Sequence, residues 1–128
     1  MTKVEKSPTD IRNRYYEITR QQRERHRNKV QKLREDFSKK ERTDRENFMA
    51  KMKSDREKFI RRNAKDNEAQ KKFFAEEEGK RKVFFSEQMD KRKTFEAELN
   101  MQSQDIESKA RERQRAFNER IREYTERY

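Results

Sequence analysis

The sequence predicts an all-α protein, built as a single long and nearly straight amphipathic helix. Three observations point to this fold class: 49% of the residues are charged, the chain has one Gly and one Pro, and bulky side chains recur at a fixed spacing. Abundant Glu, Lys, Arg and Gln with almost no Gly or Pro is typical of long helices and coiled coils. A charged composition with 27% hydrophobic residues would also fit disorder. The spacing of the bulky residues decides between the two.

An eleven-residue (hendecad) repeat organises the chain. Bulky residues follow one another at steps of eleven, with one step of fourteen between Phe59 and Phe73. We call the repeat positions the stripe: Tyr15, His26, Phe37, Phe48, Phe59, Phe73, Phe84, Phe95, Ile106, Phe117 and Tyr128. Eleven residues make three turns at about 3.67 residues per turn, so these side chains share one helix face. All of them except His26 are predicted to contact a protein partner.

The helix is expected to begin at Pro8, after a frayed segment 1–7. Proline is favoured in the first helical turn because its missing N–H has no hydrogen-bond partner there. Ser7 and Asp10 suit a helix N-terminus as a capping residue and a first-turn acid. We therefore predict a continuous helical rod over residues 8–128, with residues 12–34 as its basic end.

Two places are candidates for an interruption of this rod. Gly79 is the only glycine, but the stripe keeps its phase across it and Glu-to-basic pairs at i,i+4 surround it. We therefore favour a continuous helix, with a helical hairpin or bend at Gly79 as the alternative. Residues 63–67 form a weak point, since Asn63, Asp66 and Asn67 are poor helix formers.

The net charge of +11 is concentrated near the N-terminus. Residues 1–34 carry 11 basic and 4 acidic side chains, whereas residues 75–128 carry 13 of each. A basic end favours an acidic partner, such as an acidic protein surface, nucleic acid or an anionic membrane. The residues predicted to provide this electrostatic attachment are Arg20, Arg23, Arg25, Arg27 and Lys29.

The residue types that catalytic and metal sites require are scarce. The chain has no Cys, and His26 is its only histidine, so triads and Cys- or His-based zinc sites lack their members. One Gly excludes glycine-rich nucleotide loops. The Glu76–Glu78 run is expected to be solvated. We predict a non-enzyme without metal, cofactor or small-molecule substrate.

The favoured functional interpretation is an elongated structural protein whose stripe docks along a filament or large assembly. Aromatic anchors with charged surroundings suit a regular protein surface, and the basic excess suits an acidic lattice of the microtubule type. In composition the chain resembles the Arg/Glu/Lys-rich helical proteins of cilia and of the trichohyalin type. We expect a cytoplasmic, cytoskeletal location, with the nucleus as the alternative.

Three other partners fit parts of the pattern. The stripe also fits a homo-oligomeric coiled-coil scaffold, most readily over residues 95–128. The basic N-terminal third also fits nucleic-acid binding, although no leucine heptads follow it as they would in a basic zipper. A membrane surface ranks last, because carboxylates interrupt a narrow apolar face.

Overall fold

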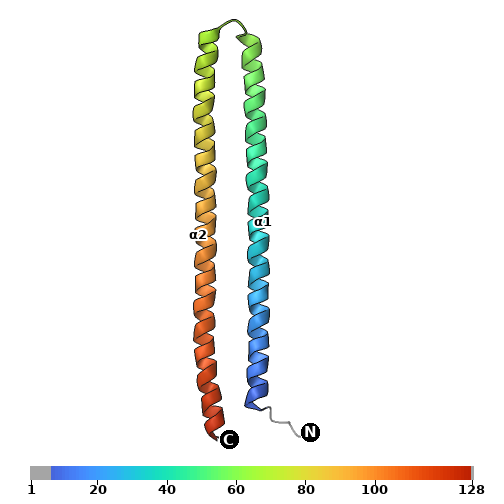
Figure 1. The fold of residues 1–128 in the computed structure, drawn as a ribbon, viewed down its shortest axis with the longest axis vertical. Coiled ribbons are helices and arrows are strands. Elements are labelled where there is room, and N and C mark those ends of the chain that lie inside the picture. Colours follow the sequence, from blue (N-terminus) through green and yellow to red (C-terminus); the bar gives the residue numbers. More distant parts are fainter. Residues whose placement is uncertain (1–6, 128) are drawn as a thin grey trace. The chain divides into compact units, whose positions relative to one another are not determined.

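The computed structural model describes residues 7–127 and contains two long helices in that range, with no strand. Helix α1 spans Pro8–Arg62 and helix α2 spans Asn67–Arg127. The two helices pack as an antiparallel hairpin (Figure 1). The all-α prediction is confirmed. Tyr128 and most of the expected frayed segment 1–7 lie outside the described residues.

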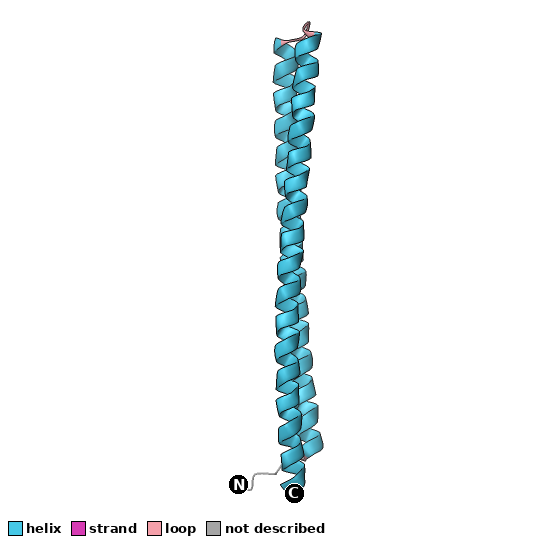
Figure 2. Cartoon of the chain, turned by 90° about the vertical axis from the view of Figure 1, so that its left-hand side faces the viewer, coloured by secondary structure: helices cyan, strands magenta, loops and turns pink. Residues whose placement is uncertain are grey.

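The hairpin corrects the prediction of one continuous helix over residues 8–128. The chain turns back at residues 63–66, which join the two helices (Figure 2). A single helix would leave its whole apolar face in water, whereas the hairpin covers that face with the second helix. Burial of apolar area stabilises the folded chain by roughly 25 cal/mol per Å², which favours the hairpin.

Helix α1 begins at Pro8 with Ser7 as its cap. The Asp10 N–H donates to Ser7 Oγ at 3.2 Å, and the Ile11 N–H donates to the Ser7 carbonyl at 3.1 Å. The first bond satisfies an amide that has no backbone partner inside the helix, and the second is the first backbone bond of the helix. The start of the helix therefore agrees with the capping signal in the sequence.

In the turn between the helices, side chains form hydrogen bonds with backbone groups and so compete with the helical hydrogen bonds. The Asn63 side-chain amide donates to the Phe59 carbonyl at 3.1 Å, and the Gln70 side-chain amide donates to the Asn63 carbonyl at 2.7 Å. Asp66 caps α2, since its Oδ1 accepts the Ala69 N–H at 3.1 Å. The predicted weak point is thus where the chain reverses.

Gly79 lies inside α2 and is not the turn. Its backbone has no positive φ angle, and an added Cβ would meet no atom within 4 Å. The hairpin at Gly79 that was the alternative to the continuous helix is therefore not formed. Without Asn or Asp beside it, this glycine has no competing cap, and the helix continues through it.

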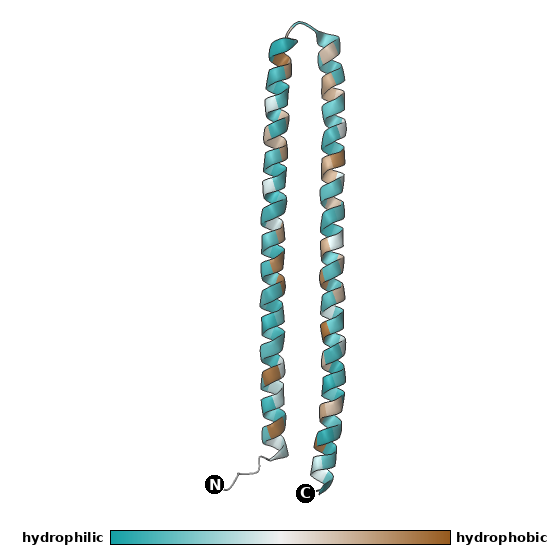
Figure 3. Cartoon of the chain, turned by 180° about the vertical axis from the view of Figure 1, so that it is seen from behind, coloured by the Kyte–Doolittle hydropathy of each residue, from teal (hydrophilic) through white to brown (hydrophobic). Residues whose placement is uncertain are grey.

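The hairpin divides into two compact units. Unit 1 combines residues up to Lys32 with residues from Glu98 onward, and unit 2 comprises Leu33–Ala97. Hydrophilic residues cover most of both helices, and hydrophobic residues occur at intervals (Figure 3).

Unit 2 is held together by stripe residues that stack across the two helices. Three ring pairs have centroid distances of 4.0–4.2 Å and nearly parallel planes: Phe37–Phe95, Phe48–Phe84 and Phe59–Phe73. Met52 is buried between these levels. The two residues of every pair lie at equal distances in sequence before and after Asp66. The fourteen-residue step therefore spans the turn, and the eleven-residue steps on either side place each ring opposite another.

Ion pairs and hydrogen bonds between the helices accompany the rings of unit 2. Arg34 pairs with Glu96 at 3.1 Å, and Arg92 pairs with Glu41. The Gln88 side-chain amide donates to the Glu41 carbonyl at 3.0 Å. These polar contacts flank the apolar seam and favour the observed register.

Unit 1 repeats the same register with fewer rings. Tyr15 stacks on Phe117 at 4.0 Å, and Leu99 and Ile121 are buried. His26 Nε2 and Ser103 Oγ share a hydrogen bond of 3.2 Å between the helices. His26 therefore acts as a polar seam residue.

Candidate functional site

The stripe is largely occupied by the chain itself. Eight of its residues form the four stacked pairs, and their rings are half-buried. Ile106 is 41% exposed, and Tyr128 lies outside the described residues. Because each stacked ring already has a partner on the other helix, only its exposed edge is free for a second protein while the hairpin is closed. A partner-binding role for the stripe stays a prediction.

Glu77 corrects the expectation that the Glu76–Glu78 run is solvated. Its position four residues after Phe73 places it on the stripe face, and it is 4% exposed. Its Oε2 lies 3.7 Å from an Arg56 terminal nitrogen across the hairpin. The Glu run therefore includes a buried member that faces α1.

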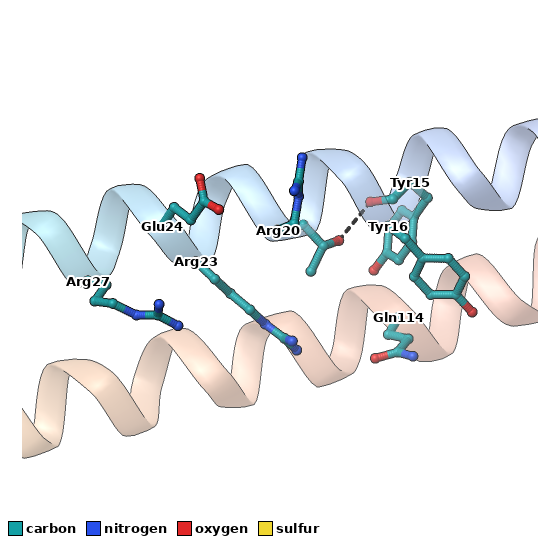
Figure 4. A pocket seen from close by; sticks show the side chains of 8 residues that line it. Tyr15, Tyr16, Arg20, Arg23, Glu24, Arg27 and Gln114 are labelled. Atoms are coloured by element: carbon teal, nitrogen blue, oxygen red, sulfur yellow. Dashed lines mark hydrogen bonds between the residues drawn. The ribbon is translucent and has the colours of Figure 1, made fainter.

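A basic groove lies on one side of unit 1 (Figure 4). Its volume is about 520 Å³. We call it the basic groove, and its lining residues are Tyr15, Tyr16, Thr19, Arg20, Arg23, Glu24, Arg27 and Gln114. Figure 4 shows the Arg23 side chain extending from α1 toward α2, where Gln114 lies. Both helices thus contribute to the groove.

The helical period explains which predicted attachment residues meet in this groove. Arg20, Arg23 and Arg27 follow one another at three- and four-residue steps, so they share one side of α1. Arg25 and Lys29 each lie two residues from Arg27, about 200° around the helix. The structure therefore brings together three of the five predicted cations and leaves Arg25 and Lys29 outside the groove.

Four members of the groove were not among the predicted site residues: Tyr16, Thr19, Glu24 and Gln114. Tyr16 directly follows the stripe residue Tyr15 and is 52% exposed. Gln114 lies on the other helix, three residues before Phe117. Tyr16 had a signal in the sequence, as an aromatic residue beside a run of arginines, whereas Gln114 could be found only once the hairpin register was known.

The groove has the chemistry of a binding surface for anionic groups. Three guanidinium groups with planar hydrogen-bond donors recognise carboxylates and phosphates. Tyr16 adds an amphipathic ring, Gln114 adds an amide that can donate or accept, and Glu24 is the one acidic group of the lining. The groove therefore carries a net positive charge, and Tyr15 and Tyr16 add aromatic side chains to its lining.

The described residues show neither a metal site nor a membrane span. Within residues 7–127, no three His, Cys, Asp or Glu side chains come close enough together to hold a metal ion. No helix in the same range has an apolar stretch that could cross a lipid bilayer.

Comparison with known proteins gives no relative. No protein-family model, no curated protein and no solved structure matches the chain.

Proposed function

We propose that this chain is a non-enzymatic structural protein that attaches to the acidic surface of a filament or large assembly, with a microtubule-type cytoskeletal lattice as the favoured partner. The observation that carries the proposal is the basic groove, which gathers Arg20, Arg23 and Arg27 beside Tyr16. Arg and Tyr are among the residues that dominate protein-binding energetics. A cytoplasmic, cytoskeletal location follows from this proposal, with the nucleus as the alternative.

The hairpin changes how attachment through the stripe would work. The stripe serves first as the seam between the two helices, and the surface left for a partner is the outer side of the hairpin. Charged groups there steer the approach of an oppositely charged surface and set orientation. The arginines of the basic groove, rather than the stacked rings, therefore form the first contact.

The test compares two charge reversals in the same segment of α1. Arg23→Glu with Arg27→Glu reverses two charges in the basic groove. Arg25→Glu with Lys29→Glu changes the net charge by the same amount outside the groove. Binding of the full chain to polymerised microtubules is measured by co-sedimentation at several salt concentrations. We expect the groove variant to bind at least about tenfold more weakly than the control variant, because close charge pairs add to affinity beyond the net charge.

Two results would overturn the proposal. Equal loss of binding in the two variants would show that net charge alone, and not the groove, attracts the filament. Tighter binding of the wild-type chain to duplex DNA than to microtubules at the same salt concentration would assign the groove to nucleic acid instead.

A homo-oligomeric scaffold is a second candidate, and the symmetry of the stripe favours it. Because the ring pairs are centred on Asp66, two chains with the turn extended into helix would form the same pairs between chains. Phe59 of one chain would then stack on Phe73 of the other. A concentration-dependent dimer in sedimentation velocity distinguishes this candidate from a monomeric hairpin.

A further inference from the structure

One side of unit 2 carries large apolar side chains from both helices. We call it the apolar side, and it is formed by Met49 and Ile60 of α1 and by Phe74 and Phe85 of α2. Each of these side chains is 39–41% exposed. None of the four is a stripe residue, so the seam does not account for them.

The helix geometry places these four residues on the same side. Each comes directly after a stripe residue, and each residue advances a right-handed helix by about 100°. In an antiparallel pair the two helices rotate in opposite senses when viewed from one end. The residues that follow the seam residues therefore turn to the same side. Phe74 and Phe85 lie edge-on to Phe73 and Phe84, with centroid distances of 6.0 and 5.6 Å.

The opposite side of unit 2 is mostly polar. The residues directly before the same four stripe residues are Asn47, Lys58, Lys72 and Val83. Val83 is 58% exposed and is the one apolar residue of this set. The apolar character is therefore concentrated on one side, where all four of these positions are apolar.

A groove of about 440 Å³ opens on the apolar side. Its lining comes from both helices and comprises Met49, Ala50, Met52, Lys53, Arg56 and Arg81. The Arg56 guanidinium lies over the Phe74 ring, 5.7 Å from its centroid. A cation held over an aromatic ring next to a concave apolar surface offers both charge and shape to a partner.

The cations of this groove are incompletely compensated. The Arg56–Glu77 and Arg81–Glu78 pairs are 3.7 and 3.9 Å apart, longer than ordinary hydrogen bonds. Among the described residues, the buried Arg56 Nε, Arg81 Nε and Glu77 Oε2 atoms have no hydrogen-bond partner. The Arg56 and Arg81 side chains remain 43% and 35% exposed, so a carboxylate can reach their terminal nitrogens.

We propose that the apolar side of unit 2 binds an acidic amphipathic helix of another protein. Met49 and Phe85 lie at one level and Ile60 and Phe74 at another, eleven residues along the helices. This separation is about 16 Å at the rise of an α-helix. A docked helix with apolar residues eleven positions apart matches both levels, and its carboxylates between them meet Arg56 and Arg81.

Charge decides between this partner and a second copy of the chain. Lys53, Arg56 and Arg81 line the groove, and Glu77 and Glu78 are the ion-pair partners of the two arginines. A second copy packed on the same side would oppose these cations with its own, and like charges at a contact are unfavourable. An acidic helix supplies the opposite charge. This surface belongs to unit 2 and does not depend on the basic groove of unit 1.

The experiment uses the full chain and a synthetic helical peptide as the probe. The peptide carries Leu pairs eleven residues apart with Glu between them, and a control peptide carries Lys in place of each Glu. Binding is measured by fluorescence anisotropy. We expect the Glu peptide to bind at least about tenfold more tightly than the Lys peptide, because charge complementarity separates two peptides with the same apolar residues.

Three variants locate the site. Phe74→Ser with Phe85→Ser is expected to weaken binding of the Glu peptide at least about tenfold, whereas Val83→Ser, an exposed apolar residue on the opposite side, should leave it unchanged. Arg81→Glu should reverse the preference between the two peptides. Circular dichroism checks that each variant is helical. If the double Phe variant unfolds, Arg81→Glu still tests the proposal.

The proposal is overturned if the Glu peptide binds no better than the Lys peptide, or if Val83→Ser weakens binding as much as the double Phe variant. Self-association of the wild-type chain that Phe74→Ser with Phe85→Ser abolishes would also overturn it, because a second copy would then occupy this side.

Discussion

The two units share one register but fill it differently. In unit 2 the repeat positions hold three stacked Phe pairs, whereas in unit 1 they hold one Tyr15–Phe117 pair and the mixed positions His26 and Ile106. The same helical geometry therefore accommodates a seam with many aromatic rings and a seam with few. Unit 2 has more stacked ring area at its seam, whereas unit 1 contains two of the three buried apolar side chains, Leu99 and Ile121.

The outer surfaces of the two units also differ in their chemistry. The groove of unit 1 is lined by arginines, tyrosines and one acid, whereas the groove of unit 2 combines three cations with Met49, Ala50 and Met52. Unit 1 contains the start of α1 at Pro8, and helix ends open with the least free energy. From the three ring pairs of unit 2 against the one of unit 1, we expect unit 2 to be the more stable part and unit 1 to open more readily.

The largest effect is expected from loss of a ring in unit 2. Phe48→Ala removes the partner of Phe84 and should lower the free energy of unfolding by about 2–3 kcal/mol, below the range for a fully buried Phe because the ring is half-exposed. Phe117→Ala should cost about 1 kcal/mol, since unit 1 can open without unit 2. Urea unfolding followed by circular dichroism measures both.

Hydrogen exchange provides the control for this comparison. We expect amides of unit 1 to exchange faster than those of unit 2 in the wild-type chain, and Phe117→Ala to raise exchange in unit 1 alone. Equal free-energy losses in the two variants, with uniform exchange along the chain, would show that the hairpin unfolds as one cooperative structure.

A smaller effect is expected from the helix caps. Asp66→Ala removes the acceptor of the Ala69 N–H in unit 2 and should cost about 1 kcal/mol, while Asp66→Asn should be nearly neutral because Asn also caps helices. Ser7→Ala removes the corresponding cap in unit 1, and a few tenths of a kcal/mol are expected since that end opens locally. Thermal unfolding of the three variants tests this order, and a larger loss from Ser7→Ala than from Asp66→Ala would contradict it.

The sequence predicts the helices but not what their apolar faces pack against. Helical periodicity identifies which face is apolar, and the capping signal at Ser7 places the start of α1 correctly. Periodicity is silent on whether that face packs on the same chain or on another. The clue to the hairpin was the symmetry of the steps, because Phe59 and Phe73 lie seven residues before and after Asp66.

The candidate sites were less accessible from the sequence than the fold. The concentration of arginines near the N-terminus indicated the basic end, and the helical period separates Arg23 and Arg27 from Arg25. Gln114 and the buried Glu77 depend on which residues of α2 lie opposite α1, which a one-dimensional pattern does not contain. The position of the turn determines which residues of α2 lie opposite α1, and this register was needed to predict the sites.

The smallest effect, a gain in stability, is expected at Gly79 in unit 2. Glycine in a helix interior costs roughly 0.5–1 kcal/mol relative to alanine, because its backbone loses more freedom on folding. The space around Gly79 is open and its φ is negative, so Gly79→Ala should raise the free energy of unfolding by about that amount. Chemical denaturation measures the gain, with Ala75→Gly, one turn earlier in α2, as the reverse substitution. A loss of stability in Gly79→Ala would mean that the chain bends at this glycine, and unit 2 would then lack the continuous α2 on which its three ring pairs depend.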